Sequence, residues 1–437
     1  MWRPLFAPSA PTWGGRVPYL LLLVCVFPFS IFAQNQNTYW GMGQNIMIIT
    51  DETDGSVNVS DAQLPLWSEG IFISDTLGHL LFYFQPSYLD YGSYEYFDKS
   101  IIRNSQHQIV NQDLKAFWAK TIIIPEPGSS RKFYIFSNLS RPHQLLTNGI
   151  VSDTFFLYHK IELTPNNQII VLERDVIVSY QNYDGKVAAV KHGNGRDWWI
   201  VTRIAESNCY HLYILDTIAV KFYKEICQGF PDMAETYNSE YSTLLFSPNG
   251  DKLCLCSAYG NCEIFDFDRN SGGMCNLRSF GYSPIVRPID LNQYYKAIFG
   301  VAFSPSGRFI YVATLDSLFQ YDTEAENVNA SRKLIFADTF ANQSLYYKIL
   351  FFRMKLASNN KIYLQHLHSV DISSAPLIDS PHNYYLGVIN NPDEEGTACN
   401  FDWFGLFLNG KMTLGFLTPY INYNLGRSLD YGNYIEP

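Results

Sequence analysis

The chain has 437 residues, of which 47% are hydrophobic, 16% aromatic and 16% charged. Soluble proteins have a charged fraction of roughly 25%, and this low value, together with the lack of a long polar tract, excludes global disorder. The 31 basic and 41 acidic side chains give a net charge of -10. This charge argues against nucleic acid as a partner, because phosphate binding needs a concentrated basic surface.

The first 33 residues have the pattern of a secretion signal peptide. Arg3 and Arg16 supply positive charge, residues 19–32 are mainly apolar, and the small Ala33 suits the position before a cleavage site. The apolar run is shorter than the ~20 residues that a membrane-spanning helix needs. We therefore predict a signal peptide over residues 1–33, with an uncleaved membrane anchor as the alternative.

Cleavage after Ala33 would leave a single domain, residues 34–437, in an oxidising compartment where disulfides form. We expect this domain to be secreted, displayed on the cell surface or held in the periplasm, with no membrane span of its own. The chain has 8 cysteines, and loss of Cys25 with the signal leaves an odd number, so at least one is predicted to stay unpaired. The remaining cysteines are Cys209, Cys227, Cys254, Cys256, Cys262, Cys275 and Cys399.

The hydrophobic pattern of this domain alternates with the period of a β-strand. Short runs of aromatic and β-branched residues are bounded by turn residues, whereas amphipathic stretches with helical spacing are scarce. Four of these runs occupy residues 80–84, 132–136, 198–201 and 309–312. The domain is therefore predicted to be all-β.

Turn signals recur before these runs. Residues 247–250 read Ser-Pro-Asn-Gly and residues 304–307 read Ser-Pro-Ser-Gly, and each follows a phenylalanine. Proline presets one backbone angle, and glycine or asparagine accepts the positive φ of a tight turn. Looser copies of this turn signal end near Gly78, Gly128, Gly195 and Asn360.

The six turn positions recur about every 56 residues, close to the roughly 40–50 residues of a four-stranded propeller blade with extended loops. Seven such units fill residues 34–437. The sequence thus predicts an all-β fold, a seven-bladed β-propeller of four-stranded antiparallel blades. A large pair of β-sandwiches or a β-helix is the alternative.

Several longer motifs occur together along the chain. The most distinctive are residues 188–199 (AAVKHGNGRDWW) and residues 385–392 (YLGVINNP). With these and further motifs at residues 68–83, 123–136 and 422–426, the chain resembles a family of exported β-propeller proteins of the Bacteroidetes associated with gliding motility and type IX secretion. The resemblance implies an envelope or extracellular location and no established reaction. Many members of that family continue into immunoglobulin-like repeats and a C-terminal sorting domain, so the resemblance further implies a shortened relative or a different route of export.

Two pairs of cysteines have the spacing of cross-strand disulfides. Cys209 and Cys227 lie symmetrically about a turn signal near residue 218, so the flanking strands would place them opposite each other. Cys256 and Cys262 lie symmetrically about a second turn signal and are expected to pair in the same way. Buried free thiols are the alternative for the second pair.

Two groups of residues have side chains of the kind that bind metals. Cys254, Cys256 and Cys262 could supply soft ligands for zinc, but cysteines in an apolar strand are more often small buried hydrophobes. His366 and His368 would share one face of a strand, yet the sequence identifies no further ligands for them. We therefore expect no metal and no cofactor.

The sequence contains no nucleophile elbow, phosphate-binding loop or dinucleotide fingerprint, and we assign no catalytic residue. We expect a monomeric binding or scaffolding module whose partner is an envelope or extracellular protein or glycan, held by loops at one face of the ring. Flat aromatic rings stack on sugars, so Trp67, Trp118 and Trp403, which lie in or near predicted turns, are the candidate binding residues.

The alternative function is an enzyme, a hydrolase or lyase, with its active site at the central channel of the propeller. A convergence of His, Arg and acidic side chains at one channel mouth would indicate the enzyme. A channel filled by aromatic and aliphatic side chains would instead indicate the binding module.

Overall fold

In the computed structural model of the chain, residues 33–437 form one unit. The predicted signal peptide, residues 1–33, lies outside the residues that the structure describes. Among the described residues no helix is long and apolar enough to cross a membrane. The structure describes residues 37–42, 46–51, 53–63, 69–86, 100–114, 121–140, 154–231, 242–257, 260–281, 297–314, 316–337, 348–369, 381–410, 417 and 420–429.

The described residues form 27 strands and three short 3₁₀ helices, and all strand pairs are antiparallel. The helices are η2 (Asn329–Ser331), η4 (Pro381–Tyr384) and η5 (Gly396–Cys399). The prediction of an all-β fold is therefore confirmed.

Five sheets have four strands each, in which chain neighbours pair in order. The first two of these sheets consist of β8 (Thr121–Pro125), β9 (Lys132–Ser140), β10 (Thr154–Leu163) and β11 (Ile169–Ser179), and of β12 (Tyr183–Lys191), β13 (Trp198–Ile204), β14 (Cys209–Leu215) and β15 (Val220–Cys227). The other three consist of β16 (Thr243–Phe246), β17 (Lys252–Cys256), β18 (Asn261–Asp268) and β19 (Gly273–Gly281); of β20 (Ile298–Phe303), β21 (Phe309–Thr314), β22 (Ser317–Asp322) and β23 (Lys333–Ala337); and of β24 (Lys348–Leu356), β25 (Ile362–Ser369), β26 (Tyr385–Ile389) and β27 (Phe401–Phe407).

The sixth sheet has seven strands in the order β3-β2-β1-β4-β5-β6-β7. Its two parts, β1–β3 and β4–β7, are joined only through the pairs Gly41–Gly70 and Met42–Glu69. The described strands thus give six hydrogen-bonded sheets, where the sequence predicted seven separate blades. The strands of this sheet are β1 (Tyr39–Met42), β2 (Ile46–Thr50), β3 (Val57–Asp61), β4 (Glu69–Ser74), β5 (Leu80–Gln85), β6 (Ser100–Asn104) and β7 (Ile109–Leu114).

The recurring turns all have the same structural role. Five of them connect the first and second strands of a four-stranded sheet, and the turn at Gly78 connects β4 to β5; the residue predicted to need positive φ has a φ between 60° and 85°. Only residues that tolerate the left-handed region are stable there, which explains the recurring Gly or Asn. The six residues are Gly78, Gly128, Gly195, Gly250, Gly307 and Asn360.

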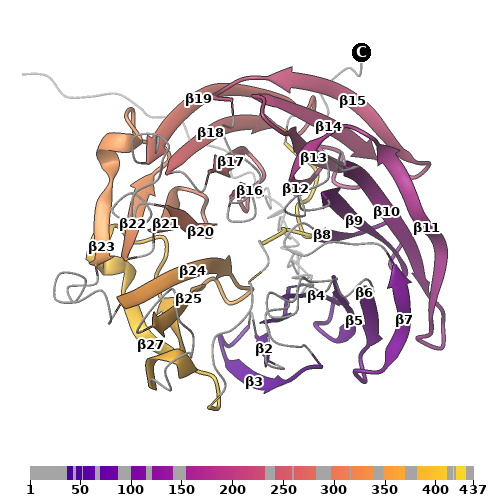
Figure 1. Cartoon of the computed structure of the whole chain (residues 1–437), viewed down its shortest axis with the longest axis horizontal. Helices are drawn as coiled ribbons and strands as arrows, with labels where there is room; N and C mark the ends of the chain where they lie inside the picture. The colour runs from indigo at the N-terminus through magenta and orange to yellow at the C-terminus, as the bar shows by residue number, and fades with distance from the viewer. Residues whose placement is uncertain are drawn as a thin grey trace, which may run out of the picture. The chain divides into compact units, whose positions relative to one another are not determined.

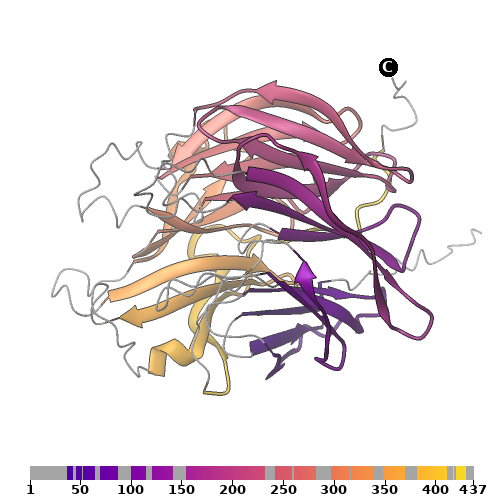
Figure 2. The same cartoon turned by 45° about the vertical axis from the view of Figure 1, so that its right-hand side comes forward.

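Six hydrophobic clusters connect the sheets into a closed ring (Figures 1 and 2). The first cluster joins β4–β7, β8–β11 and β12–β15, and the next three connect the following sheets pairwise as far as β24–β27. The last two connect β24–β27 to β1–β3 and β1–β3 to β4–β5. Because each sheet is packed on both faces by its neighbours around an axis, residues 33–437 form a β-propeller.

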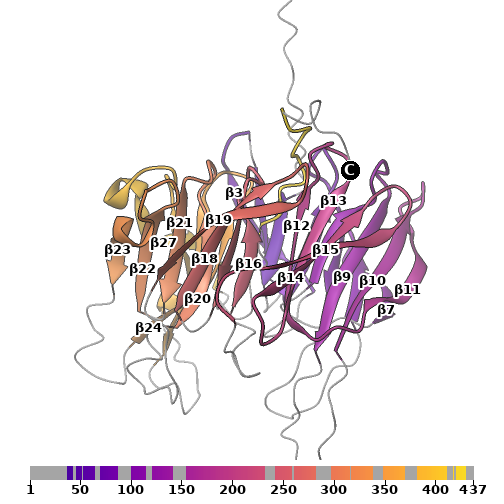
Figure 3. The same ribbon diagram turned by 90° about the horizontal axis from the view of Figure 1, so that it is seen from above.

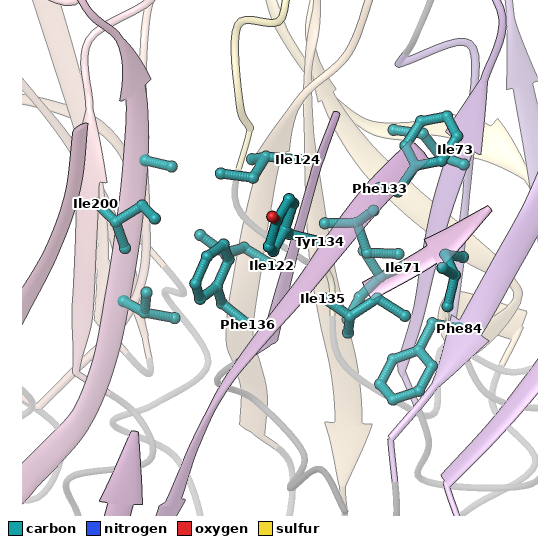
Figure 4. Packing of buried hydrophobic residues seen from close by; sticks show 14 of the residues in the cluster. Ile71, Ile73, Phe84, Ile122, Ile124, Phe133, Tyr134, Ile135, Phe136 and Ile200 are labelled. Atoms are coloured by element: carbon teal, nitrogen blue, oxygen red, sulfur yellow. The ribbon is translucent and has the colours of Figure 1, made fainter. Parts of the chain in front are cut away.

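The packing between sheets explains the high aromatic content. In the largest cluster, Phe133 and Phe136 of β9 are almost fully buried, together with Ile71 of β4, Ile122 of β8 and Ile200 of β13 (Figure 4). A flat ring and a branched aliphatic chain fill the wedge between two twisted sheets without leaving a void. Many of the aromatic residues are thus part of the core.

Candidate functional site

The first strand of each four-stranded sheet lies nearest the axis of the ring (Figure 1). These inner strands are β8, β12, β16, β20 and β24, with β4 in the corresponding place in the seven-stranded sheet. All six lead into the recurring turns, so these turns mark one end of the axis. We call this end of the axis the turn end, and we call the opposite end the far end.

The C-terminal segment, residues 420–429, covers part of the turn end (Figure 3). Tyr423 is 5% exposed, and its hydroxyl donates a hydrogen bond to the carbonyl oxygen of Ile123 in β8 at 2.8 Å. The side-chain amide of Asn422 donates to the carbonyl oxygen of Pro248, in the turn of the β16–β19 sheet. This segment therefore ties together turns that belong to different sheets.

Two further bonds hold the same segment to the β12 turn. The backbone N–H of Ser428 donates to the carbonyl oxygen of Gly193 at 2.7 Å. The guanidinium of Arg269 donates to the carbonyl oxygens of both Lys191 and Gly426. The C-terminal segment is thus held to part of the turn end by several hydrogen bonds.

Three inner strands are irregular away from the turn end. In β12 the pairing with β13 shifts between Tyr183 and Val187, and the extra residues include Gly185 with a φ of 83°. In β20 the shift lies at Phe299, near the start of the strand, and in β24 it lies at mid-strand, between Phe351 and Met354. Bulges re-aim side chains and are over-represented next to functional sites.

The bulge of β12 contains a buried ion pair. The ammonium group of Lys186 donates to the carboxylate of Asp184 at 2.5 Å, and the two side chains are 1% and 4% exposed. The Asp184 carboxylate also accepts from the backbone N–H of Lys186, while the carbonyl oxygen of Lys186 accepts from the side-chain amide of Asn138 in the neighbouring sheet. Removing two charges from water is costly, so a buried ion pair of this kind adds little to the free energy of unfolding.

The bulges of β20 and β24 meet each other. A Cβ atom on Gly300 would lie 2.1 Å from the carbonyl oxygen of Phe352, so glycine is required for the two backbones to approach. The rings of Phe299 and Phe352 pack edge to face, with centroids 6.1 Å apart. This contact sets the position of the residue that follows Phe352, which is Arg353.

Arg353 reaches across the ring. Its Nη1 donates a hydrogen bond to the Oγ1 of Thr243 in β16 at 3.0 Å. The sheets that begin with β16 and β24 are not neighbours, because the β20–β23 sheet lies between them. The Arg353 side chain therefore passes through the interior of the ring rather than between two packed sheets.

Lys355 follows two residues later on β24 and is 4% exposed. Its burial lowers the pKa of the ammonium group from 10.5 to about 8, because the charged form loses hydration. A lysine of this kind can bind an anion when protonated and accept a proton when neutral.

We name Asp184, Lys186, Thr243, Arg353 and Lys355 the inner-strand cluster. The structure joins Lys186 to Asp184 and Arg353 to Thr243, and these residues lie on three inner strands, β12, β16 and β24. Arginine and lysine side chains can bind carboxylate, phosphate or sulfate groups through charge-assisted hydrogen bonds. These residues are arginine, lysine, aspartate and threonine on the inner strands. The hydrophobic clusters between the sheets consist instead of aromatic and aliphatic side chains.

Of the predicted binding residues, the structure describes only Trp403; Trp67 and Trp118 lie outside the described part of the chain. Trp403 lies in β27, partly buried, and its indole stacks on the ring of His366 with centroids 4.7 Å apart. A second ring, that of Phe336, lies 4.8 Å from it. Trp403 is thus packed among aromatic side chains of the β20–β23 and β24–β27 sheets.

The structure forms both predicted disulfides. Cys209 pairs with Cys227 across β14 and β15, with Cα atoms 3.9 Å apart, and Cys256 pairs with Cys262 across β17 and β18, with Cα atoms 4.1 Å apart. The alternative of a zinc site at Cys254, Cys256 and Cys262 is therefore wrong for this state, because two of its three thiolates are used.

The remaining cysteines and the predicted histidine pair differ in their exposure to solvent. Cys254 and Cys399 are buried free thiols, and Cys275 is an exposed free thiol. His366 is buried, with its Nε2 3.1 Å from the carbonyl oxygen of Trp403. The side chain of His368 lies outside the described part of the structure.

Sequence reasoning did not find the inner-strand cluster. A weak signal was present, since Asp-Gly-Lys at residues 184–186 and Arg-Met-Lys at residues 353–355 interrupt otherwise apolar strands. Charged residues inside a buried strand are rare unless they are paired or functional. Their relation across the ring could be seen only after the strands were placed.

Comparison with known proteins gave matches among solved structures alone. No protein-family model matches the chain, and no curated protein sequence matches it. A protein of unknown function from Desulfotomaculum acetoxidans is 12% identical with a TM-score of 0.47, over 86% of this chain and 96% of that chain. The β-propeller domain of Cps50 (Swd1) from Myceliophteria thermophila is 11% identical with a TM-score of 0.40, over 76% of this chain and 94% of that chain. The periplasmic gluconolactonase of Pseudomonas aeruginosa is 12% identical with a TM-score of 0.40, over 76% of this chain and 95% of that chain.

Proposed function

We propose that residues 34–437 form a seven-bladed β-propeller that acts outside the cytoplasm as a binding module for an envelope or extracellular glycan or protein. The observation that carries this proposal is Arg353, whose side chain spans the interior of the ring. The turn end is tied down by the chain's own C-terminal segment, so a ligand would enter from the far end.

The seventh blade in this proposal is β1–β3. These strands pack on β24–β27 through one cluster and on β4–β5 through another, as a separate blade would. The link between β1 and β4 involves two residue pairs, whereas β1 and β2 share four. Counting β1–β3 and β4–β7 as two blades gives seven with the five four-stranded sheets.

Export is proposed on two grounds. Residues 1–33 have the composition of a signal peptide, and two disulfides are compatible with an oxidising compartment. The resemblance to exported propellers of the Bacteroidetes leads us to propose the cell envelope, or its outside, as the location and gliding motility or type IX secretion as the setting. Mass spectrometry of fractionated native cells tests this proposal, and an unprocessed Met1 in the cytoplasm would contradict it.

The charge of the inner-strand cluster narrows the ligand. Arg353 and Lys355 lie two residues apart on β24, and cationic side chains favour an anionic group, so we propose a glycan that carries carboxylate or sulfate groups. Arginine binds such planar or tetrahedral anions through several parallel N–H donors. A neutral glycan would displace water from these charged side chains without offering an opposite charge in return, so its binding is expected to be weaker.

A glycan array with acidic and neutral oligosaccharides tests this function. The wild-type chain is expected to bind acidic members, and Arg353→Met is expected to weaken that binding by at least about tenfold, the loss of one charged hydrogen-bond partner. The matched control is Arg308→Met, which removes an exposed arginine paired with Asp322 on the outside of a turn. Binding that is absent, or that Arg353→Met leaves unchanged, would contradict the proposal.

The enzyme alternative is supported by one observation, the lowered pKa of Lys355. A lysine with a pKa of about 8 is roughly one-tenth neutral at pH 7, and the neutral form can act as a general base, as a lyase requires. Incubation of the same acidic oligosaccharides with the wild-type chain and with Lys355→Met distinguishes the two functions. Cleaved oligosaccharides that form with the wild type but not with Lys355→Met would indicate a lyase. Oligosaccharides that stay intact while bound to the wild type would indicate the binding module.

A further inference from the structure

Four side chains that could bind a metal lie on one face of the β14–β15 hairpin. Cys209 lies opposite Cys227, and His211 lies opposite Glu225. Residues two apart on a strand project from the same face, so the four side chains form two adjacent cross-strand pairs. Neighbours in this arrangement have Cβ atoms about 5 Å apart and diagonal partners about 7–8 Å apart, within reach of a common centre.

Three of the four residues have their ligand atoms close together. The two Sγ atoms and a carboxylate oxygen of Glu225 all lie within 4.8 Å of one another. His211 is not in this group, but its Nε2 is 2.9 Å from the Oε2 of Glu225, so the imidazole adjoins the group through that carboxylate. Two thiolates, an imidazole and a carboxylate are a donor set that zinc binds in tetrahedral geometry.

The imidazole of His211 is already oriented for this role. Its Nδ1 is hydrogen-bonded to the hydroxyl of Tyr183 at 2.7 Å, which leaves Nε2 on the side of Glu225. Histidines that bind metals are held in this way, with the second ring nitrogen bonded to a neighbouring group. Tyr183 is in turn bonded to Tyr213 and Ser179, so the orientation rests on a fixed network.

The hairpin lies at the periphery of the ring. β15 is the outermost strand of its sheet, and Cys227 and Glu225 are exposed. The second disulfide differs, since Cys256 and Cys262 are both fully buried. A soluble reductant and a metal ion can therefore reach the first disulfide and not the second.

We propose that the Cys209–Cys227 disulfide is the oxidised form of a redox-controlled zinc site made of Cys209, Cys227, His211 and Glu225. A dithiol transfers two electrons and two protons to the disulfide, becomes a disulfide itself and leaves two thiols on the hairpin. Zn²⁺ then binds both sulfurs, the Nε2 of His211 and a carboxylate oxygen of Glu225, and the two thiol protons are released to solvent. The hairpin is cross-linked in both states, by a disulfide in one and by the metal in the other.

Cobalt titration of the full chain tests this site, because Co²⁺ bound by thiolates has a characteristic charge-transfer absorption. The chain is treated with a dithiol, desalted without oxygen and titrated with Co²⁺, and Zn²⁺ is then added as competitor. We expect one Co²⁺ per chain after reduction and none before it, with displacement by Zn²⁺. Far-ultraviolet circular dichroism follows the fold in parallel.

Three variants make the test specific. Glu225→Gln and His211→Gln are each expected to weaken Co²⁺ binding by at least about tenfold, since each removes one ligand. Cys275→Ser, which removes the exposed free thiol of β19, is the matched control and is expected to bind as the wild type does. The proposal is overturned if the reduced chain shows no thiolate absorption with Co²⁺, or if both ligand variants bind with unchanged affinity. A reduced chain that unfolds and does not refold with Zn²⁺ overturns it equally.

Discussion

Arg353 of β24 donates a hydrogen bond to Thr243 of β16 at 3.0 Å, although an entire sheet separates their two strands along the chain. The β20–β23 sheet packs between the two sheets. A ring of sheets around an axis brings the inner strands of such non-neighbouring sheets close to one another. The bond therefore links the architecture of the molecule to the site proposed for its ligand.

Tyr423 is predicted to stabilise the ring by tying the C-terminal segment to β8. Replacing Tyr423 by Phe leaves the carbonyl oxygen of Ile123 without this donor, at an expected cost of about 1–2 kcal/mol in the free energy of unfolding. Urea denaturation measures this cost. Tyr180→Phe is the control, because Tyr180 is 74% exposed and is expected to change stability by less than about 0.5 kcal/mol. Equal stabilities for the two variants would show that the segment contributes nothing to the fold.

Gly300 is predicted to tolerate no side chain. An added Cβ would lie 2.1 Å from the carbonyl oxygen of Phe352, so Gly300→Ala must push β20 and β24 apart. The expected loss is about 1–3 kcal/mol, typical of overpacking in a tight core. Gly426→Ala is the matched control, since nothing lies within 4 Å of a Cβ at that position. Thermal unfolding of both variants checks the prediction, and a Gly300→Ala protein as stable as the control would refute the close approach.

Lys355 is predicted to make stability depend on alkaline pH. Its folded-state pKa is about 8 and its ordinary value is 10.5, so between these values the unfolded chain binds the proton more strongly. Stability rises with pH wherever the unfolded state binds more protons. The wild type should therefore gain stability relative to Lys355→Met as the pH rises from 8 toward 10.

Lys191 contributes in the same direction, since its burial also lowers the pKa to about 8. The test therefore uses the difference in the free energy of unfolding between the wild type and Lys355→Met, in which the contribution of Lys191 cancels. Urea unfolding measures this difference at each pH. A difference that stays constant over this range would contradict the lowered pKa of Lys355.

The two disulfides are predicted to differ in their resistance to reduction. Cys227 is exposed, whereas Cys256 and Cys262 are fully buried, and attack by a thiolate needs access to a sulfur atom. In a titration of the folded chain with a dithiol, followed by alkylation and peptide mass mapping, Cys209 and Cys227 should be labelled at a lower dithiol concentration than Cys256 and Cys262. Labelling of both pairs at the same reductant concentration would contradict the difference in burial.

Local chemistry explains which features the sequence could predict. The turn at Gly250 could be placed because its positive φ restricts the residue type, and Cys209 could be paired with Cys227 because both are equally far from a turn. Such features depend on a few neighbouring residues, whose preferences are known.

The missed features depend on residues far apart in the chain. The bond from Arg353 to Thr243 joins sheets whose residues are 110 positions apart in sequence. The bulge at Gly185 depends on how β12 pairs with β13, which the residue types alone do not specify. The sequence also did not predict that β1–β3 and β4–β7 are hydrogen-bonded to each other. The pairs Gly41–Gly70 and Met42–Glu69 join two parts that the repeat pattern treats as separate. Trp403 illustrates a third case, because its stacking on His366 is a packing relation that residue type alone does not reveal.

A double-mutant cycle between Arg353 and Thr243 tests the central claim most directly. The free energies of unfolding of the wild type, Arg353→Met, Thr243→Val and the double variant are measured by urea denaturation. If Arg353 crosses the interior of a closed ring to Thr243, the two substitutions should couple by about 1–2 kcal/mol, within the range for residues in direct contact. Strict additivity of the two substitutions would contradict the ring-spanning contact and, with it, the placement of the ligand site.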